Sequence, residues 1–138
     1  MNTETSANKL LFISDVHLGG FNQAENQVIE EKLIRLLQFC EENGFKVHIL
    51  GDLFDYWMEY PNHRPELGKK LLDYFEAYNQ RTGSTLYITG NHDNWTNGFF
   101  KKIGFEVERN HRFLHVDEKK VMLLHGDGLA NPEFNLPR

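Results

Sequence analysis

Aspartate, asparagine and histidine residues recur directly after four short apolar runs of this 138-residue sequence. The groups are Asp15 and His17 after Lys9–Ser14, Asp52 and Asp55 after Phe45–Leu50, Asn91, His92 and Asp93 after Ser84–Thr89, and His125 and Asp127 after Lys119–Leu124. A single aspartate after a strand is more often a turn or helix cap than a ligand. Because all four runs end in residues of ligand type, we expect their side chains to share one site.

These residue types suit a site for divalent metal ions. Oxygen donors mixed with imidazole, without thiolate, favour Mn²⁺, Fe²⁺ or Zn²⁺ over a structural zinc. An aspartate at the centre of a sheet can bridge two cations about 3.5–4 Å apart, as two-metal phosphoester hydrolysis requires. Such a pair of ions binds both oxygens of a phosphoryl group and acidifies a bridging water. The sequence therefore predicts a metal-dependent hydrolytic site.

The elements that position these residues alternate between strand and helix. The four apolar runs, rich in β-forming residues and bounded by Gly, Asn or Asp, are typical of buried strands. Between them lie two amphipathic helices, one over residues 25–44 with apolar positions Ile29, Leu33, Leu36, Leu37 and Cys40, and one from Pro65 to Gly83 with Leu67, Leu71, Phe75 and Tyr78. This alternation predicts an α/β fold with a mostly parallel sheet and crossover helices. Ligands of such sheets gather at the carboxyl ends of the strands.

The stretch from Asn94 to Asp117 has a weaker pattern. We expect a short helix near Thr96–Ile103 and a hairpin around Phe105–Val116. The run Lys119–Leu124 then supplies a further strand whose end reaches the same edge of the sheet.

Composition narrows the class of protein. The length fits one domain over residues 1–138. Acidic residues exceed basic ones, 20 against 15, so nucleic acid is not an expected partner. The single cysteine, Cys40, excludes an intramolecular disulfide and a multi-thiolate zinc site. Because the first residues lack the pattern of a secretory signal and no apolar run approaches 20 residues, we expect a cytoplasmic protein without a transmembrane segment.

The ligand-type residues stand in four ordered motifs. They are Asp15-Val16-His17, Gly51-Asp52-Leu53-Phe54-Asp55, Gly90-Asn91-His92-Asp93 and His125-Gly126-Asp127, within residues 9 to about 128. This order resembles that of the calcineurin-like metallophosphoesterases. The resemblance implies the N-terminal part of an αββα sandwich, with the metal site at the carboxyl ends of the strands.

The resemblance also implies a role for each site residue. Asp15 and His17 would hold a first metal ion, Asp52 would bridge, and Asn91 and His125 would hold a second, with Mn²⁺ as the expected metal and Fe²⁺ or Zn²⁺ as alternatives. His92 would stabilise the phosphoryl oxygens or protonate the leaving group. Asp93 and Asp55 would orient imidazole rings.

Within the superfamily, the segments 51–57 and 90–95 most resemble UDP-2,3-diacylglucosamine pyrophosphatases, which act in lipid A assembly. This implies a lipid-linked pyrophosphate substrate and peripheral contact with the inner membrane surface. Several of those enzymes carry Arg where this chain has His92. Two interpretations stay open for Tyr56, Trp57, Trp95, Phe99 and Phe100: an apolar wall that takes an acyl chain, or ordinary core packing.

The chain departs from the superfamily in lacking a Gly-His-x-His motif after His125. We therefore expect an incomplete domain, the N-terminal part of a longer enzyme, that self-associates to cover a bare sheet face. His111 and His115 are expected as hairpin or surface residues. The alternatives are a general phosphomonoesterase, phosphodiesterase or phosphoprotein phosphatase, and a catalytically incomplete binding module.

Overall fold

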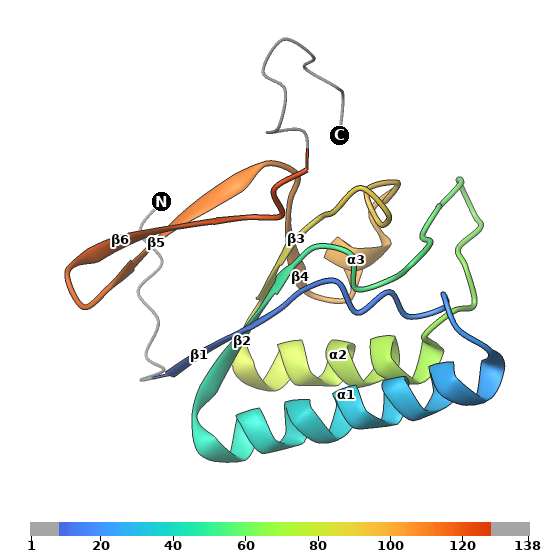
Figure 1. Cartoon of the computed structure of the whole chain (residues 1–138), viewed down its shortest axis with the longest axis horizontal. Coiled ribbons are helices and arrows are strands. Elements are labelled where there is room, and N and C mark those ends of the chain that lie inside the picture. Colours follow the sequence, from blue (N-terminus) through green and yellow to red (C-terminus); the bar gives the residue numbers. More distant parts are fainter. Residues whose placement is uncertain (1–8, 128–138) are drawn as a thin grey trace, which may run out of the picture.

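A computed structural model describes residues 9–127 of the chain (Figure 1). Its elements are β1 (Lys9–Ile13), α1 (Gln23–Asn43), β2 (Phe45–Leu50), α2 (Lys69–Thr82), β3 (Thr85–Ile88), α3 (Phe99–Lys102), β4 (Phe105–Glu108), β5 (His111–Val116) and β6 (Lys119–Leu124). β1 to β4 form a parallel sheet in the order β1-β2-β3-β4, and β5 and β6 form a separate antiparallel pair. The predicted α/β class with a parallel sheet and crossover helices is confirmed.

The two long helices cover one face of the parallel sheet (Figure 1). They connect neighbouring strands, and right-handed crossovers place successive helices on the same side. α1 begins where the Asn22 side chain accepts a hydrogen bond from the Glu25 amide at 2.9 Å, and it ends at the predicted Gly44. β1 and β2 pair in parallel, beginning with Lys9 opposite Phe45. The carboxyl ends of neighbouring strands consequently meet at one edge.

The main core lies between these helices and the sheet. Leu37 of α1, Phe75 of α2 and Ile49 of β2 are almost fully buried there. Trp57 and Phe100 belong to the same core, because the Phe100 ring stacks 4.7 Å from both Trp57 and Tyr87. The core interpretation thus holds for Trp57, Phe100 and the partly buried Phe99, whereas Tyr56 and Trp95 are exposed.

The hairpin of β5 and β6 packs on the opposite face of the sheet. Leu114 and Leu123 of the hairpin join Leu86 and Ile88 of β3 in a second, smaller apolar cluster. Phe12 on β1 lies 43% exposed. His111 and His115 are exposed on β5, as expected of hairpin residues.

Two predictions about the second half of the chain are wrong. The fourth parallel strand is β4, whereas β6 pairs antiparallel with β5. The hairpin consequently turns at Asp117 and Glu118 and not within Phe105–Val116. Both turn residues have positive φ, 48° and 67°, the geometry of a tight two-residue hairpin turn. Such turns favour Asn-Gly or Asp-Gly, so Asp-Glu gave no turn signal.

Two helix starts also differ from prediction. α2 begins at Lys69 and not at Pro65, because Gly68 has a left-handed backbone (φ 69°) that helical residues do not adopt. α3 begins after the left-handed Gly98 and is shorter than the predicted helix over 96–103. No helix within residues 9–127 combines the length and apolar character needed to cross a membrane.

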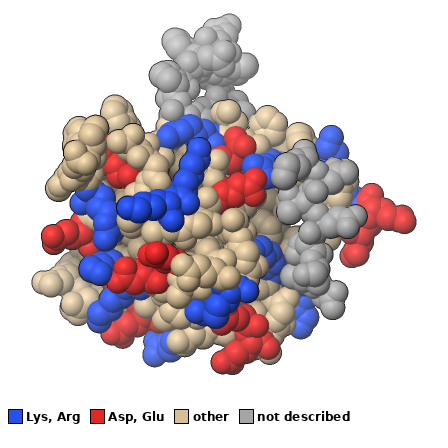
Figure 2. All heavy atoms as spheres, turned by 180° about the vertical axis from the view of Figure 1, so that it is seen from behind, with Lys and Arg blue, Asp and Glu red and all other residues tan. Residues whose placement is uncertain are grey.

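Acidic and basic side chains are interspersed over the face shown in Figure 2. Charged side chains within residues 9–127 form pairs between elements or along one helix, such as Arg81 with Glu41 at 3.0 Å and Lys69 with Asp73 at 2.8 Å. Exposed pairs of this kind each contribute little to stability.

Candidate metal centre

The loops that follow β1, β2 and β3 run side by side at the carboxyl edge of the sheet. The amides of Asp15 and His17 donate to the carbonyl oxygens of Gly51 and Asp52, each at 3.0 Å. The Trp57 amide donates in turn to the His92 carbonyl at 3.2 Å. Main-chain hydrogen bonds therefore hold the loops that carry the ligand-type side chains side by side, in the same order as the strands before them.

Asp52 lies at the centre of the site. Its Oδ2 atom is 3.7 Å from His17 Nε2 and 3.3 Å from His125 Nε2, while Oδ1 accepts from the His92 amide at 2.9 Å. The Asp52 side chain is only 3% exposed. One carboxylate oxygen therefore faces an imidazole nitrogen on each side.

A further oxygen donor accompanies each of these imidazoles. Asp15 Oδ1 lies 3.6 Å from His17 Nε2, and Asn91 Oδ1 lies 3.2 Å from His125 Nε2. His125 reaches the site from the end of β6, in the second sheet. All five metal-ligand candidates of the sequence are thus brought together, with Asp52 between the two halves.

Hydrogen bonds fix which nitrogen of each imidazole is free. Nδ1 of His125 lies 2.7 Å from the Leu50 carbonyl oxygen, and Nδ1 of His92 lies 2.7 Å from the Asp55 carbonyl oxygen. Because a carbonyl only accepts, Nδ1 carries the proton in both rings. His17 Nδ1 faces Asp55 Oδ1 at 3.0 Å, and a carboxylate partner selects the same tautomer. With its Nδ1 bonded in this way, Nε2 of His17 and of His125 is the nitrogen that can supply an electron pair to a metal ion.

The backbone is strained at three of these residues. Asp15, His17 and Asp52 have φ of 55°, 54° and 55°, in the left-handed region that non-glycine residues rarely adopt. Strain of this kind costs on the order of 1–3 kcal/mol per residue and clusters at functional sites. The surrounding structure holds it in place here, through the paired loops described above.

Two glycines permit the close approach of these segments. A Cβ atom at Gly90 would collide with Asp52 Oδ1, and one at Gly51 would collide with the His125 ring. Both positions therefore require the smallest residue.

Asp93 differs from its predicted role of orienting an imidazole. Its carboxylate is fully buried and accepts from the amides of Gly90 (2.7 Å), Leu53 (2.9 Å) and Asp52 (3.2 Å) and from the Tyr87 hydroxyl. These four bonds use both oxygens, which leaves the carboxylate no site for an imidazole. Asp93 thus ties the turn at Asp52 to the turn at Gly90. Burial raises the pKa of Asp93, and burial followed by the charge of Asp93 raises the pKa of Tyr87 well above its usual value.

His92 is the exposed imidazole of the site. Its bond to the Asp55 carbonyl raises its pKa, and the charges of Asp52, Asp55 and Asp93 act in the same direction. The ring packs edge-on against His17, with centroids 4.8 Å apart. An exposed imidazole with a raised pKa is suited to donating a proton or a hydrogen bond to an anion.

The donor set fits divalent cations. Two groups of side chains, His17 with Asp55 and His92, and Asp15 with Asp52 and His125, present ligand atoms within 4.8 Å of one another. Carboxylates and neutral imidazoles are ligands shared by manganese, iron and zinc sites.

The sequence of the chain matches the family model described as calcineurin-like phosphoesterase over residues 8–134. The chain belongs to this family. Members bind divalent metal ions, which agrees with the donor set assembled here.

Curated relatives of this chain are 28–31% identical to it over the aligned residues. A UDP-2,3-diacylglucosamine hydrolase of Aliivibrio fischeri is 31% identical over 88% of this chain and 48% of its own length. Proteins of the same name from Photorhabdus laumondii and Porphyromonas gingivalis are 31% and 28% identical, over 93% and 86% of this chain and 52% and 46% of their own lengths. The chain thus spans about half the length of the curated relatives it matches.

A solved structure has a similar fold. A protein of unknown function from Aquifex aeolicus aligns with a TM-score of 0.53 and 18% identity, covering 82% of the present chain and 57% of that protein. At this identity the likeness supports the fold alone.

Two residues near the site were missed by sequence reasoning. Tyr87 stands inside the run Ser84–Thr89, where its hydroxyl could not be told from ordinary strand packing. Arg109 lies outside every motif, yet its guanidinium binds the loop after Asp93. Its proximity depends on β4 lying beside β3, and a different pairing was predicted.

Proposed function

We propose that this chain binds two divalent metal ions on either side of Asp52 and hydrolyses a phosphoester. The observation that carries the proposal is the position of Asp52 Oδ2 between His17 Nε2 and His125 Nε2, at 3.7 and 3.3 Å. A carboxylate placed between two imidazole rings is suited to serve two cations at once.

The ligands divide between two ions. Asp15, His17 and Asp52 would hold the first ion, and Asp52, Asn91 and His125 the second. When bound, such ions polarise a phosphoryl oxygen and lower the pKa of a water molecule. We propose Mn²⁺ as the metal, since oxygen donors with imidazole suit it.

The remaining residues act on the substrate or on the ligands. His92 would donate a hydrogen bond or a proton to a phosphoryl or leaving-group oxygen from Nε2, because its Nδ1–H is held by the Asp55 carbonyl. The Asp55 carboxylate fixes the ring of His17. Asp93 is a positioning residue that holds the strained turn at Asp52.

We propose a pyrophosphate linked to a nucleotide as the substrate, of the class to which UDP-2,3-diacylglucosamine belongs. The names of the Aliivibrio and Photorhabdus relatives, each 31% identical to this chain, support this choice.

Calorimetric titration with Mn²⁺ tests the metal assignment. We expect about two ions per chain, and we expect Asp52→Asn to weaken both together because the shared charge is lost. Asp73→Asn, at an exposed aspartate of α2 paired with Lys69, is the matched control and should bind like the wild type. An Asp52→Asn chain with normal metal stoichiometry would refute the assignment.

Hydrolysis separates the substrate classes. Release of UMP from UDP-2,3-diacylglucosamine, with little action on aryl phosphates, supports the proposed substrate. The reverse preference would assign the chain to the general phosphomonoesterases.

A further inference from the structure

A cavity of about 730 Å³ opens beside the metal centre. Asn91 and Asp127 line it, as do Trp95, Thr96 and Arg109. Sites for small molecules have volumes of about 300–1,000 Å³. Because Asn91 also faces His125, a phosphate bound at the centre would carry its attached group into this space.

Trp95 provides the large apolar surface of the cavity. Its side chain is 64% exposed, more than any other large apolar residue within 9–127. The backbone beneath it is fixed, since Trp95 pairs with Met58 and its carbonyl accepts from the Glu59 amide at 2.9 Å. An indole held at its base and open at its face is a ready surface for stacking.

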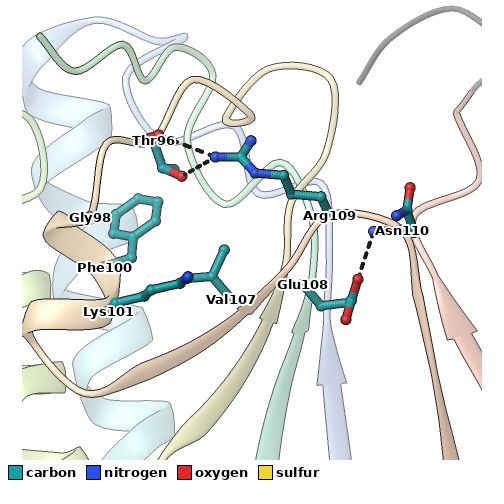
Figure 3. A pocket seen from close by; sticks show the side chains of 8 residues that line it. All are labelled: Thr96, Gly98, Phe100, Lys101, Val107, Glu108, Arg109 and Asn110. Atoms are coloured by element: carbon teal, nitrogen blue, oxygen red, sulfur yellow. Dashed lines mark hydrogen bonds between the residues drawn. The ribbon is translucent and has the colours of Figure 1, made fainter.

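Arg109 fixes the residues on both sides of Trp95. Its guanidinium donates to the Asn94 carbonyl and Oδ1 at 2.6 and 2.8 Å, and to the Thr96 carbonyl and Oγ1 at 3.2 and 3.0 Å. Figure 3 shows this side chain reaching from the end of β4 to Thr96, above a smaller cavity of about 360 Å³. A loop ordered before binding loses less conformational freedom on binding.

The lining, which combines apolar surface with polar side chains, indicates which group the cavity takes. Apart from Trp95 and Pro61, its side chains are amides, carboxylates, a hydroxyl and a guanidinium. An alkyl chain would use the apolar part of this lining and none of its polar groups. A planar heterocycle offers an apolar face to the indole and polar atoms at its edge.

We propose that this cavity receives the base of a nucleotide, stacked on Trp95, while the phosphate lies at the metal centre. The inference rests on the proposed function and deepens it, because it assigns one side of the scissile bond to a particular surface. Arg109 is a positioning residue for this contact.

Binding of four probes in the presence of Mn²⁺ tests the proposal: UMP, uridine, N-acetylglucosamine 1-phosphate and inorganic phosphate. We expect UMP and uridine to quench the fluorescence of Trp95, which calorimetry complements with affinities. Trp95→Ala should weaken UMP binding by about 5- to 150-fold, the range for one stacked base, and leave phosphate binding unchanged. Trp95→Phe keeps an aromatic ring and should weaken UMP binding less than Trp95→Ala does. Phe39→Ala, at a 52% exposed aromatic of α1, is the control.

Each outcome has a separate meaning. Equal losses for UMP and phosphate in Trp95→Ala, or quenching by the sugar phosphate and not by UMP, would overturn the nucleotide assignment. Quenching by uridine with no binding of phosphate would support the stacking site and count against the proposed metal-dependent function.

Discussion

Two regions of this molecule, the core under the helices and the loops at the carboxyl edge of the sheet, differ in backbone geometry and in polarity. In the core, Leu37, Phe75 and Phe100 fill space on regular helices and strands. At the edge, Asp15 and His17 adopt left-handed backbone that their residue types disfavour. A well-packed core can thus hold strained, polar loops in a single arrangement.

The largest expected effect is a loss of turnover caused by a change in the loops at the carboxyl edge of the sheet. His92→Ala should lower turnover by about 10²–10⁴-fold, the usual contribution of a positioned acid or base. Because its Nδ1 is bonded to the Asp55 carbonyl and it has no place among the proposed ligands, Mn²⁺ affinity should stay near that of the wild type. Turnover and calorimetry on the same preparation check this. Loss of metal would mean that His92 is itself a ligand.

A truncation in the core should have its effect on stability instead. Phe100 is fully buried and stacks on Trp57 and Tyr87, so Phe100→Ala should lower the free energy of unfolding by about 3–5 kcal/mol. Urea denaturation measures it, and the exposed Phe39 changed to Ala is the control, with an expected change within about 0.5 kcal/mol. A small loss would show that the ring cluster tolerates a cavity.

Asp93 lies where the two regions meet. Asp93→Asn keeps the volume but converts one acceptor oxygen into a donor that faces main-chain amides. Mn²⁺ affinity should fall by about 10- to 100-fold, as for other groups that support ligands, although the residue touches no metal. Tyr87→Phe removes one of the four hydrogen bonds to Asp93 and should lower Mn²⁺ affinity less than Asp93→Asn does. Unchanged affinity in both variants would limit Asp93 to a role in stability.

The smallest expected effect comes from His48 in β2. Burial lowers the pKa of His48, so the unfolded chain takes up a proton at a higher pH than the folded chain does. The contribution of His48 to the free energy of unfolding should therefore be fully present above its pKa in the unfolded chain, about 6.5. It should be lost as pH falls toward its lower pKa in the folded chain. Denaturation at a series of pH values should show this slope in the wild type and lose part of it in His48→Gln. His111→Gln, at the exposed start of β5, should keep the slope.

The sequence predicted the first half of the fold better than the second. Asn22 to Gly44 carries its own helix signals, so α1 and its neighbouring strands were placed correctly. β4 was recognised as a strand but given the wrong partner. It pairs in parallel with β3, from Thr85 opposite Phe105 onward, and this contact between segments distant in the sequence is not encoded in any local pattern.

In the site, the motifs predicted which residues would meet, because parallel strands bring their ends together. They did not predict how each side chain is used. Asp93 sits beside His92 in the chain, yet its carboxylate points into the protein toward the amides of Asp52 and Leu53. This contact depends on β2 lying beside β3, which brings the loops after the two strands together.

The origin of His125 in the second sheet has a thermodynamic consequence. An ion held jointly by His125 and Asp52 would cross-link β6 to the loop after β2, so that separating the hairpin from the parallel sheet would require the ion to dissociate. The hairpin is otherwise anchored by few apolar residues, Leu114 and Leu123 among them. Metal saturation should accordingly slow amide hydrogen exchange in β5 and β6 more than in α1, and a chelator should reverse it.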